Sequence, residues 1–172
     1  MPPPLTENTF KESIEHAVQN VFHTMLQKSA APVHGASPVP TTEPWARPED
    51  LGGTIAVGSV GFAGDICGLV YLYLSETLAH QAVQGMLGMT PEEVASAGRE
   101  VMSDVIGELT NMTVGVFKNR IHDLGYPCKL TIPTVVWGSN IAIQPTRGTV
   151  RRTYVFLVEG HSVIADLIFK EI

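Results

Sequence analysis

The chain has 172 residues, of which 44% are hydrophobic and 16% charged, and its formal net charge at pH 7 is -6. This acidic balance argues against nucleic acid as the main partner, because phosphate binding needs clustered Lys and Arg. The N-terminus has no basic segment followed by an apolar one, and no apolar run approaches the roughly 20 residues that span a bilayer. We therefore expect one domain over residues 1–172, without membrane association and located in the cytoplasm.

The cysteines and histidines show no spacing typical of a metal site. Cys67 and Cys128 are isolated in apolar surroundings, and the six histidines form no i,i+4 pair. Buried free thiols are favoured over a disulfide or metal ligands for both cysteines. We expect no metal centre.

The N-terminal third combines a helix with a Pro-rich connection. Residues 1–5 are expected to be a disordered start. An amphipathic repeat after Thr6, a plausible N-cap, predicts a first helix that ends at about Lys28. Residues 29–52 predict a long extended loop, because their prolines exclude a helix or a central strand: Pro32, Pro38, Pro40, Pro44 and Pro48.

Alternating or β-branched runs predict the strands. Residues 54–62 and 66–74 form a hairpin around Ala63-Gly64-Asp65, and its glycines Gly58, Gly61 and Gly68 indicate that a partner element lies close. Later strands are expected at 129–137, interrupted by Pro133 at an edge or bulge, and at 149–158 and 161–169 around a tight turn.

Cap signals predict the remaining helices. Ser75 and Gly88 bound one helix, Thr90-Pro91 begins the next, and Gly98 can bend the chain before a long central helix. Helices grouped between hairpins predict an α+β fold: a two-layer, mostly antiparallel sheet with the long central helix and further helices packed on one face.

Residues 98–122 of the central helix have one polar stripe. At about 100° per residue, six residues fall within roughly one third of the circumference: Asp104, Gly107, Glu108, Asn111, Gly115 and Lys118. The opposite side is apolar and is expected to face the core. Each glycine costs about 1 kcal/mol relative to Ala inside a helix, so the bare positions indicate that another surface comes close, for docking or for packing.

A glutamate and an asparagine three residues apart on an exposed helix are common by chance, so this pair alone establishes no function. Ser103 and Ser139 lack a recognisable base partner, which argues against a Ser-His-Asp hydrolase.

The spacing of the polar residues is more specific than the pair. Three residues separate Asp104 from Glu108, two separate Glu108 from Asn111, and 21 separate Asn111 from Pro133 in IPTVVWG. This pattern resembles the signature of the CheC/CheX phosphatases of bacterial chemotaxis, in which an acidic residue or Ser precedes ExxN and a proline follows. The resemblance covers about residues 53–172.

CheC-type members carry two such motifs, whereas a single ExxN is the CheX pattern. Glu108 alone among the glutamates has an Asn three residues later. The resemblance therefore implies a CheX-like protein, which forms a homodimer with one site per subunit. The Pro-rich stretch departs most from the family and leaves the first strand of the sheet unassigned.

The resemblance also implies an activity, the hydrolysis of the aspartyl phosphate of a CheY-like response regulator in chemotaxis or related two-component signalling. Asn111 would orient the attacking water, and Glu108 would pair with a lysine of the receiver domain, with general-base catalysis by Glu108 as the alternative. Asp104 would either contact the receiver surface or cap a local network, and Gly107 and Gly115 would permit the close approach of the receiver. The enzyme would need no cofactor of its own, because the phosphorylated receiver supplies Mg²⁺.

Two other interpretations remain at this stage. A CheX-like module could bind a receiver domain or another signalling partner without hydrolysing anything. A structural dimer with a merely solvated stripe would lose only helix propensity when Asn111 is replaced.

Overall fold

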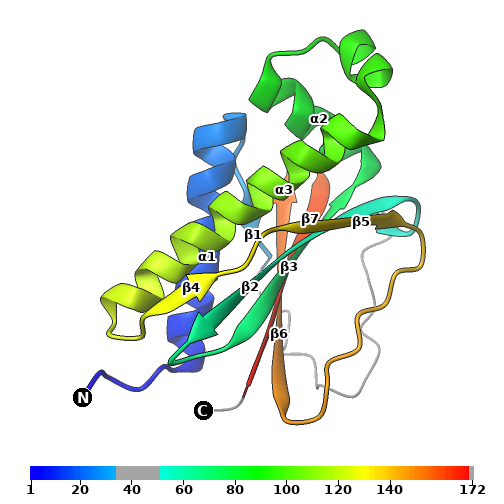
Figure 1. The fold of residues 1–172 in the computed structure, drawn as a ribbon. Helices are drawn as coiled ribbons and strands as arrows, with labels where there is room; N and C mark the ends of the chain where they lie inside the picture. The colour runs from blue at the N-terminus through cyan, green and yellow to red at the C-terminus, as the bar shows by residue number, and fades with distance from the viewer. Residues whose placement is uncertain (34–50, 171–172) are drawn as a thin grey trace.

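In the computed structural model, which describes residues 1–33 and 51–170, three helices cover one face of a seven-stranded antiparallel sheet (Figure 1). The sheet order is β1-β6-β7-β3-β2-β4, and β5 also pairs with β2. This arrangement confirms the predicted two-layer α+β fold. The helices are α1 (Glu7–Leu26), α2 (Glu76–Leu87) and α3 (Pro91–Asp123), and the strands are β1 (Ala31–Pro32), β2 (Ile55–Gly64), β3 (Gly68–Ser75), β4 (Cys128–Leu130), β5 (Thr134–Gly138), β6 (Thr149–Val158) and β7 (His161–Lys170).

The start of α1 is held by a reciprocal cap. The Thr6 hydroxyl accepts from the Thr9 amide at 3.2 Å, and the Thr9 hydroxyl accepts from the Thr6 amide at 3.3 Å. The helix ends at Leu26, two residues before the predicted end, because Gln27 adopts a left-handed conformation with φ of 54°.

Residues 1–5, where we expected a disordered start, contain no helix or strand but lie against the body. The Tyr126 hydroxyl donates to the Pro3 carbonyl at 2.9 Å, and Leu5 packs against the core. The N-terminal segment is thereby tethered to the loop that follows α3.

Only the ends of the predicted Pro-rich loop, residues 29–52, can be compared with the structure, because residues 34–50 lie outside the described part of the chain. At its beginning, Ala31 and Pro32 form β1 at the edge of the sheet, where they oppose Leu157 and Phe156 of β6. An edge tolerates proline, because the side of the residue that lacks the N–H can face away from the neighbouring strand there.

The predicted helix boundaries in the middle of the chain are confirmed. The Ser75 hydroxyl accepts from the Leu78 amide at 3.2 Å, and Gly88 ends α2 with φ of 65°. Thr90 caps α3 through a reciprocal box with Glu93, and the helix kinks at Gly98, whose φ is 82°. In the described residues, no helix is both long and apolar enough to cross a bilayer.

The central helix lies very close to β2 because Gly58 has no side chain. A Cβ at Gly58 would lie 2.1 Å from the Thr110 hydroxyl oxygen. Thr110 and Thr113 have polar side chains, yet both are buried. Their hydroxyls donate to the helix carbonyls of Ile106 and Leu109 at 2.7 and 2.8 Å, which satisfies them without a partner outside the helix.

The face of the sheet away from the helices carries a buried ion pair. Arg151 of β6 binds Asp166 of β7 through two nitrogens, at 2.9 and 2.6 Å. The same guanidinium donates to the Ile143 carbonyl at 3.1 Å, which ties the β5–β6 connection to the sheet. Burial opposes the charge on Arg151, but the hydrogen bond and the charge of Asp166 outweigh it and raise the pKa of Arg151.

Candidate docking and catalytic face of α3

The three polar residues of the predicted motif lie on the middle of α3, beyond the kink. Asp104 and Glu108 are exposed, and Asn111 is half-buried. Their spacing of four and three residues keeps them on one side of the helix, and Asn111, seven residues after Asp104, lies about 10 Å further along the axis. The helix therefore presents two carboxylates and one amide in a single row.

This row, Asp104, Glu108 and Asn111, is not engaged by the surrounding protein. Within residues 1–33 and 51–170, no hydrogen bond or ion pair involves any of these three side chains. Exposed carboxylates and a half-buried amide that have no internal partner are available to a second molecule. The geometry thus suits contact with a partner better than a structural role.

The two glycines of the stripe differ from each other. Gly115 is open, with no atom within 4 Å of the position that a Cβ would take. Gly107 is buried, and a Cβ there would lie 3.6 Å from Val135 and 3.7 Å from Pro133. The bare surface at Gly107 is thus covered by the β4–β5 segment of this chain. Pro133 occupies the place beside Gly107 that was expected to be open to a partner.

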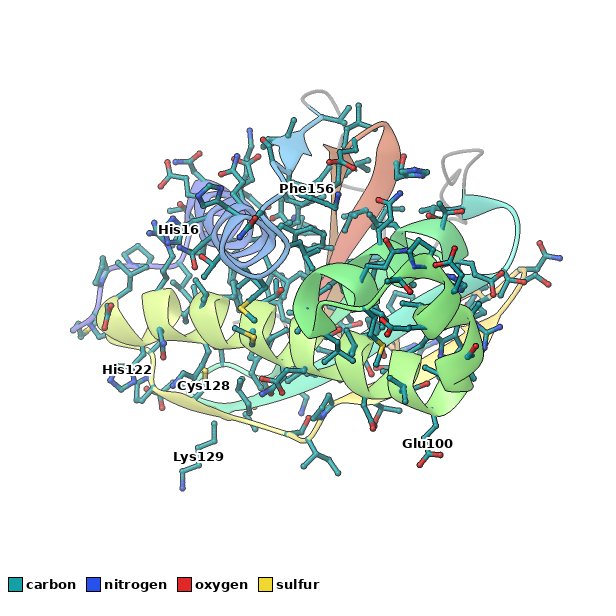
Figure 2. All side chains as sticks on the ribbon, turned by 90° about the horizontal axis from the view of Figure 1, so that it is seen from above. His16, Glu100, His122, Cys128, Lys129 and Phe156 are labelled. Atoms are coloured by element: carbon teal, nitrogen blue, oxygen red, sulfur yellow. The ribbon has the colours of Figure 1, made fainter. Side chains whose placement is uncertain are left out.

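The segment from β4 to β5 runs beside α3 along the motif (Figure 1). Figure 2 shows Cys128 of β4 pointing toward α3 while its neighbour Lys129 points away from the body, as alternation along a strand requires. Cys128 is a free buried thiol, as predicted, whereas Cys67 is only half-buried. Pro133, the proline of the motif, lies over Gly107 on the same helix that carries Glu108 and Asn111.

A cluster at the start of the motif was missed in the sequence. The Trp137 indole N–H donates to the Ser103 hydroxyl at 2.8 Å, and the Arg99 guanidinium lies 3.9 Å from the centre of the Trp137 ring. Arg99 also binds Glu76 of α2 at 3.1 Å. This cluster fixes β5 against α3 just before Asp104. A tryptophan in a short strand was the available signal, because its ring needs a surface to cover.

Other chemistry finds little support at this face. In the described ranges no group of three or more His, Cys, Asp or Glu could hold a metal ion. Ser103, which had no recognisable base partner in the sequence, is instead hydrogen-bonded to Trp137. Lys118, at the far end of the stripe, is half-buried.

The sequence and the fold were compared with those of known proteins. The family model described as "Chemotaxis phosphatase CheX" matches residues 56–157, which is more than half of the chain. The chain belongs to the CheX family. This membership confirms the resemblance seen in the sequence.

A curated CheX relative extends the comparison. "CheY-P phosphatase CheX" of Thermotoga maritima is 36% identical over 86 residues, which is 49% of this chain and 53% of that protein. The chain thus spans about half the length of the curated relative that it matches.

Solved CheX and CheC-like structures share the fold. A CheC-like superfamily protein from Shewanella sp. PV-4 is 26% identical, with a TM-score of 0.75 over 96% of this chain and 100% of that one. CheX in the "CheX-CheY-BeF3-Mg+2 complex" of Borrelia burgdorferi is 18% identical, with a TM-score of 0.65 over 94% of this chain and 98% of that one. At this identity the Borrelia match supports the fold alone.

Proposed function

We propose that this CheX family member hydrolyses the aspartyl phosphate of a CheY-like response regulator, in chemotaxis or related two-component signalling. The observation that carries the proposal is the row of Asp104, Glu108 and Asn111, which faces outward without an internal partner on the helix that holds the family's motif. The names of the relatives are consistent with it: the Thermotoga protein is called a CheY-P phosphatase, and the Borrelia CheX was solved together with CheY.

The chemistry needs little from this enzyme beyond positioning. An acyl phosphate is already activated, and the receiver domain brings its own Mg²⁺ and lysine. What it lacks is a water held in line with the P–O bond that breaks, and positioning is a large share of catalysis in phosphoryl transfer. We assign this task to Asn111, because a neutral amide both donates and accepts hydrogen bonds and does not repel the phosphoryl oxygens.

The carboxylates of the row would set the register of docking. Glu108 is exposed one turn before Asn111 and would form a charge-assisted hydrogen bond with the lysine of the receiver. Asp104 lies one further turn away and would contact the receiver surface. The open position at Gly115 leaves room on the other side of Asn111.

We further propose that the protein acts as a homodimer with one site per subunit, and that it holds no cofactor of its own. The Mg²⁺ would enter and leave with the receiver. Chelation of Mg²⁺ should then abolish turnover without changing the fold or the melting temperature of the protein alone, which circular dichroism can measure.

The direct test is phosphate release from phosphorylated CheY of Thermotoga maritima, with and without catalytic amounts of this protein. Acceleration that continues over many turnovers supports the proposal. Binding to the activated receiver without acceleration would instead support the non-catalytic adaptor, and the family relation would then hold for the fold alone.

A further inference from the structure

The connection between β4 and β5 is a bulge. Leu130 opposes Phe62 of β2, and Thr134 opposes Ser59. Three residues, Thr131 to Pro133, therefore lie opposite only two residues of β2. Bulges of this kind turn a side chain out of the regular alternation and are frequent beside functional sites.

The residue that this bulge turns outward is Ile132, which is 85% exposed. Apart from the terminal Met1, the other exposed large apolar side chains among the described residues are between 39% and 51% exposed. Single apolar residues at a surface are ordinary, so exposure alone indicates nothing. What distinguishes Ile132 is its position and the way in which it is held.

The backbone on both sides of Ile132 is fixed. Thr131 exchanges two hydrogen bonds with Gly61: its amide donates to the Gly61 carbonyl at 2.9 Å, and its hydroxyl accepts from the Gly61 amide at 2.8 Å. On the other side, Pro133 has a restricted φ and packs over Gly107. Because this backbone is already ordered, burial of the Ile132 side chain by a partner costs little backbone conformational entropy.

Ile132 also lies next to the row. Its neighbour Pro133 packs over Gly107, and Gly107 lies on α3 between Asp104 and Glu108. The apolar side chain thus stands at the border of a polar surface that has no internal partner. Exposed ion pairs contribute little affinity by themselves, whereas a buried apolar anchor contributes much more.

We infer that Ile132 is the apolar anchor of receiver docking and inserts into an apolar recess beside the phosphorylated aspartate of the receiver. This inference rests on the proposed function and adds a division of labour to it. Ile132 supplies affinity, Glu108 the register, and Asn111 the catalysis. Ile132 itself does not touch the reacting atoms, so its loss affects binding and not the chemical step.

The test compares Ile132→Ser with wild type, with Ile132→Leu as the conservative variant and Leu157→Ser as the matched control. Leu157 is an apolar residue on β6 and is 43% exposed. Two strands, β7 and β3, separate β6 from β2 in the sheet. The probe is beryllofluoride-activated CheY of Thermotoga maritima for the Kd, and its phosphorylated form for KM and kcat. We expect Ile132→Ser to raise Kd and KM about tenfold, as the loss of a buried Ile predicts, with kcat unchanged. Ile132→Leu and Leu157→Ser should bind as wild type does.

Unchanged Kd and KM in Ile132→Ser, beside an active wild type, would overturn this inference and leave the proposed function standing. A fall in kcat as large as the fall in kcat/KM would also overturn it, because the loss would then lie in the chemical step and not in binding. A change in molar mass by light scattering would overturn it too, because it would place Ile132 in a contact between copies of the chain. A wild type that neither binds nor dephosphorylates the receiver would overturn both this inference and the proposed function. Melting curves of all four proteins establish that each variant is folded.

Discussion

At the scale of single residues, the roles that we propose for Glu108 and Asn111 differ by charge. In this proposal the carboxylate attracts a cation of the partner, and the amide orients water near an anion without repelling it. Helical periodicity was sufficient to predict that these residues share a face, because the spacing of 3.6 residues per turn is local. That Pro133 covers Gly107 could not be predicted, because a local sequence pattern does not indicate which distant segment packs on a helix.

Glu108→Gln tests the predicted register contact. The change keeps the size and one acceptor oxygen but removes the charge, so Kd for the activated receiver should rise about two- to fivefold, in line with the roughly 0.2–1 kcal/mol of an exposed ion pair. The dependence of Kd on salt should also weaken. Isothermal titration at low and at high salt measures both effects.

Glu100→Gln is the matched control, since Glu100 is exposed on the same helix just beyond the kink (Figure 2). If Glu108→Gln and Glu100→Gln give the same Kd and the same salt dependence, Glu108 does not contact a cation of the receiver.

At the scale of elements, the position of α3 depends on the glycine that faces it. The glycines of β2 and β3 predicted that a partner element lies close, and at Gly58 this partner is α3 itself. The burial of Thr110 and Thr113 was not predicted, because a hydroxyl that bonds within its own helix is apolar toward its neighbours. Strand pairings in the hairpins followed from alternation and turn residues, which are local signals.

Gly58→Ala should disturb this contact. The new methyl group would lie 2.1 Å from the Thr110 hydroxyl oxygen, so the Thr110 side chain, α3 or β2 must shift. We expect a loss of about 1–3 kcal/mol in the free energy of unfolding, as is typical of overpacking, measured by urea denaturation.

Two further variants make this experiment specific. Gly53→Ala, where no atom lies within 4 Å of the Cβ position, should be close to neutral. The double variant Gly58→Ala with Thr110→Ala should recover part of the stability. A Gly58→Ala protein as stable as wild type would contradict the close contact between α3 and β2.

At the scale of the whole molecule, the helix-free face of the sheet is held by charge as well as by apolar packing. Arg151 and Asp166 are 4% and 0% exposed, and Thr153 also donates to Asp166 at 3.1 Å. Alternation along residues 149–158 predicts that Phe156 and Val158 share one side of the strand, and both are in the core. It could not predict that Arg151, on the other side, is buried, since its partner lies 15 residues away and across the ladder.

Asp166→Asn removes one charge of this buried pair and should lower the free energy of unfolding by about 3–5 kcal/mol, because Arg151 is left buried without its counter-charge. Thermal or urea unfolding measures the loss. The activity per folded molecule should stay the same, since the pair lies on the face opposite the helices.

An exposed ion pair of the same chain is the control. Glu7 of α1 binds Arg152 of β6, and this hydrogen bond holds the pKa of Glu7 below its usual value of 4.5. The pair contributes stability above that pH and loses it as Glu7 is protonated at lower pH. Glu7→Gln at neutral pH should cost less than about 1 kcal/mol. An equal cost for Asp166→Asn and Glu7→Gln would contradict the structural role of the buried pair.

The most direct test of the proposed activity is the rate of phosphate release from phosphorylated CheY at saturating receiver, for wild type and for Asn111→Ala. Asn119→Ala serves as the control, since Asn119 is an exposed asparagine on the same helix outside the row. We predict that Asn111→Ala keeps its fold and its Kd for the activated receiver but loses about a hundredfold in kcat, because the water is no longer positioned. Asn119→Ala should match wild type. An Asn111→Ala protein with wild-type kcat would contradict the assignment of this side chain to the attacking water.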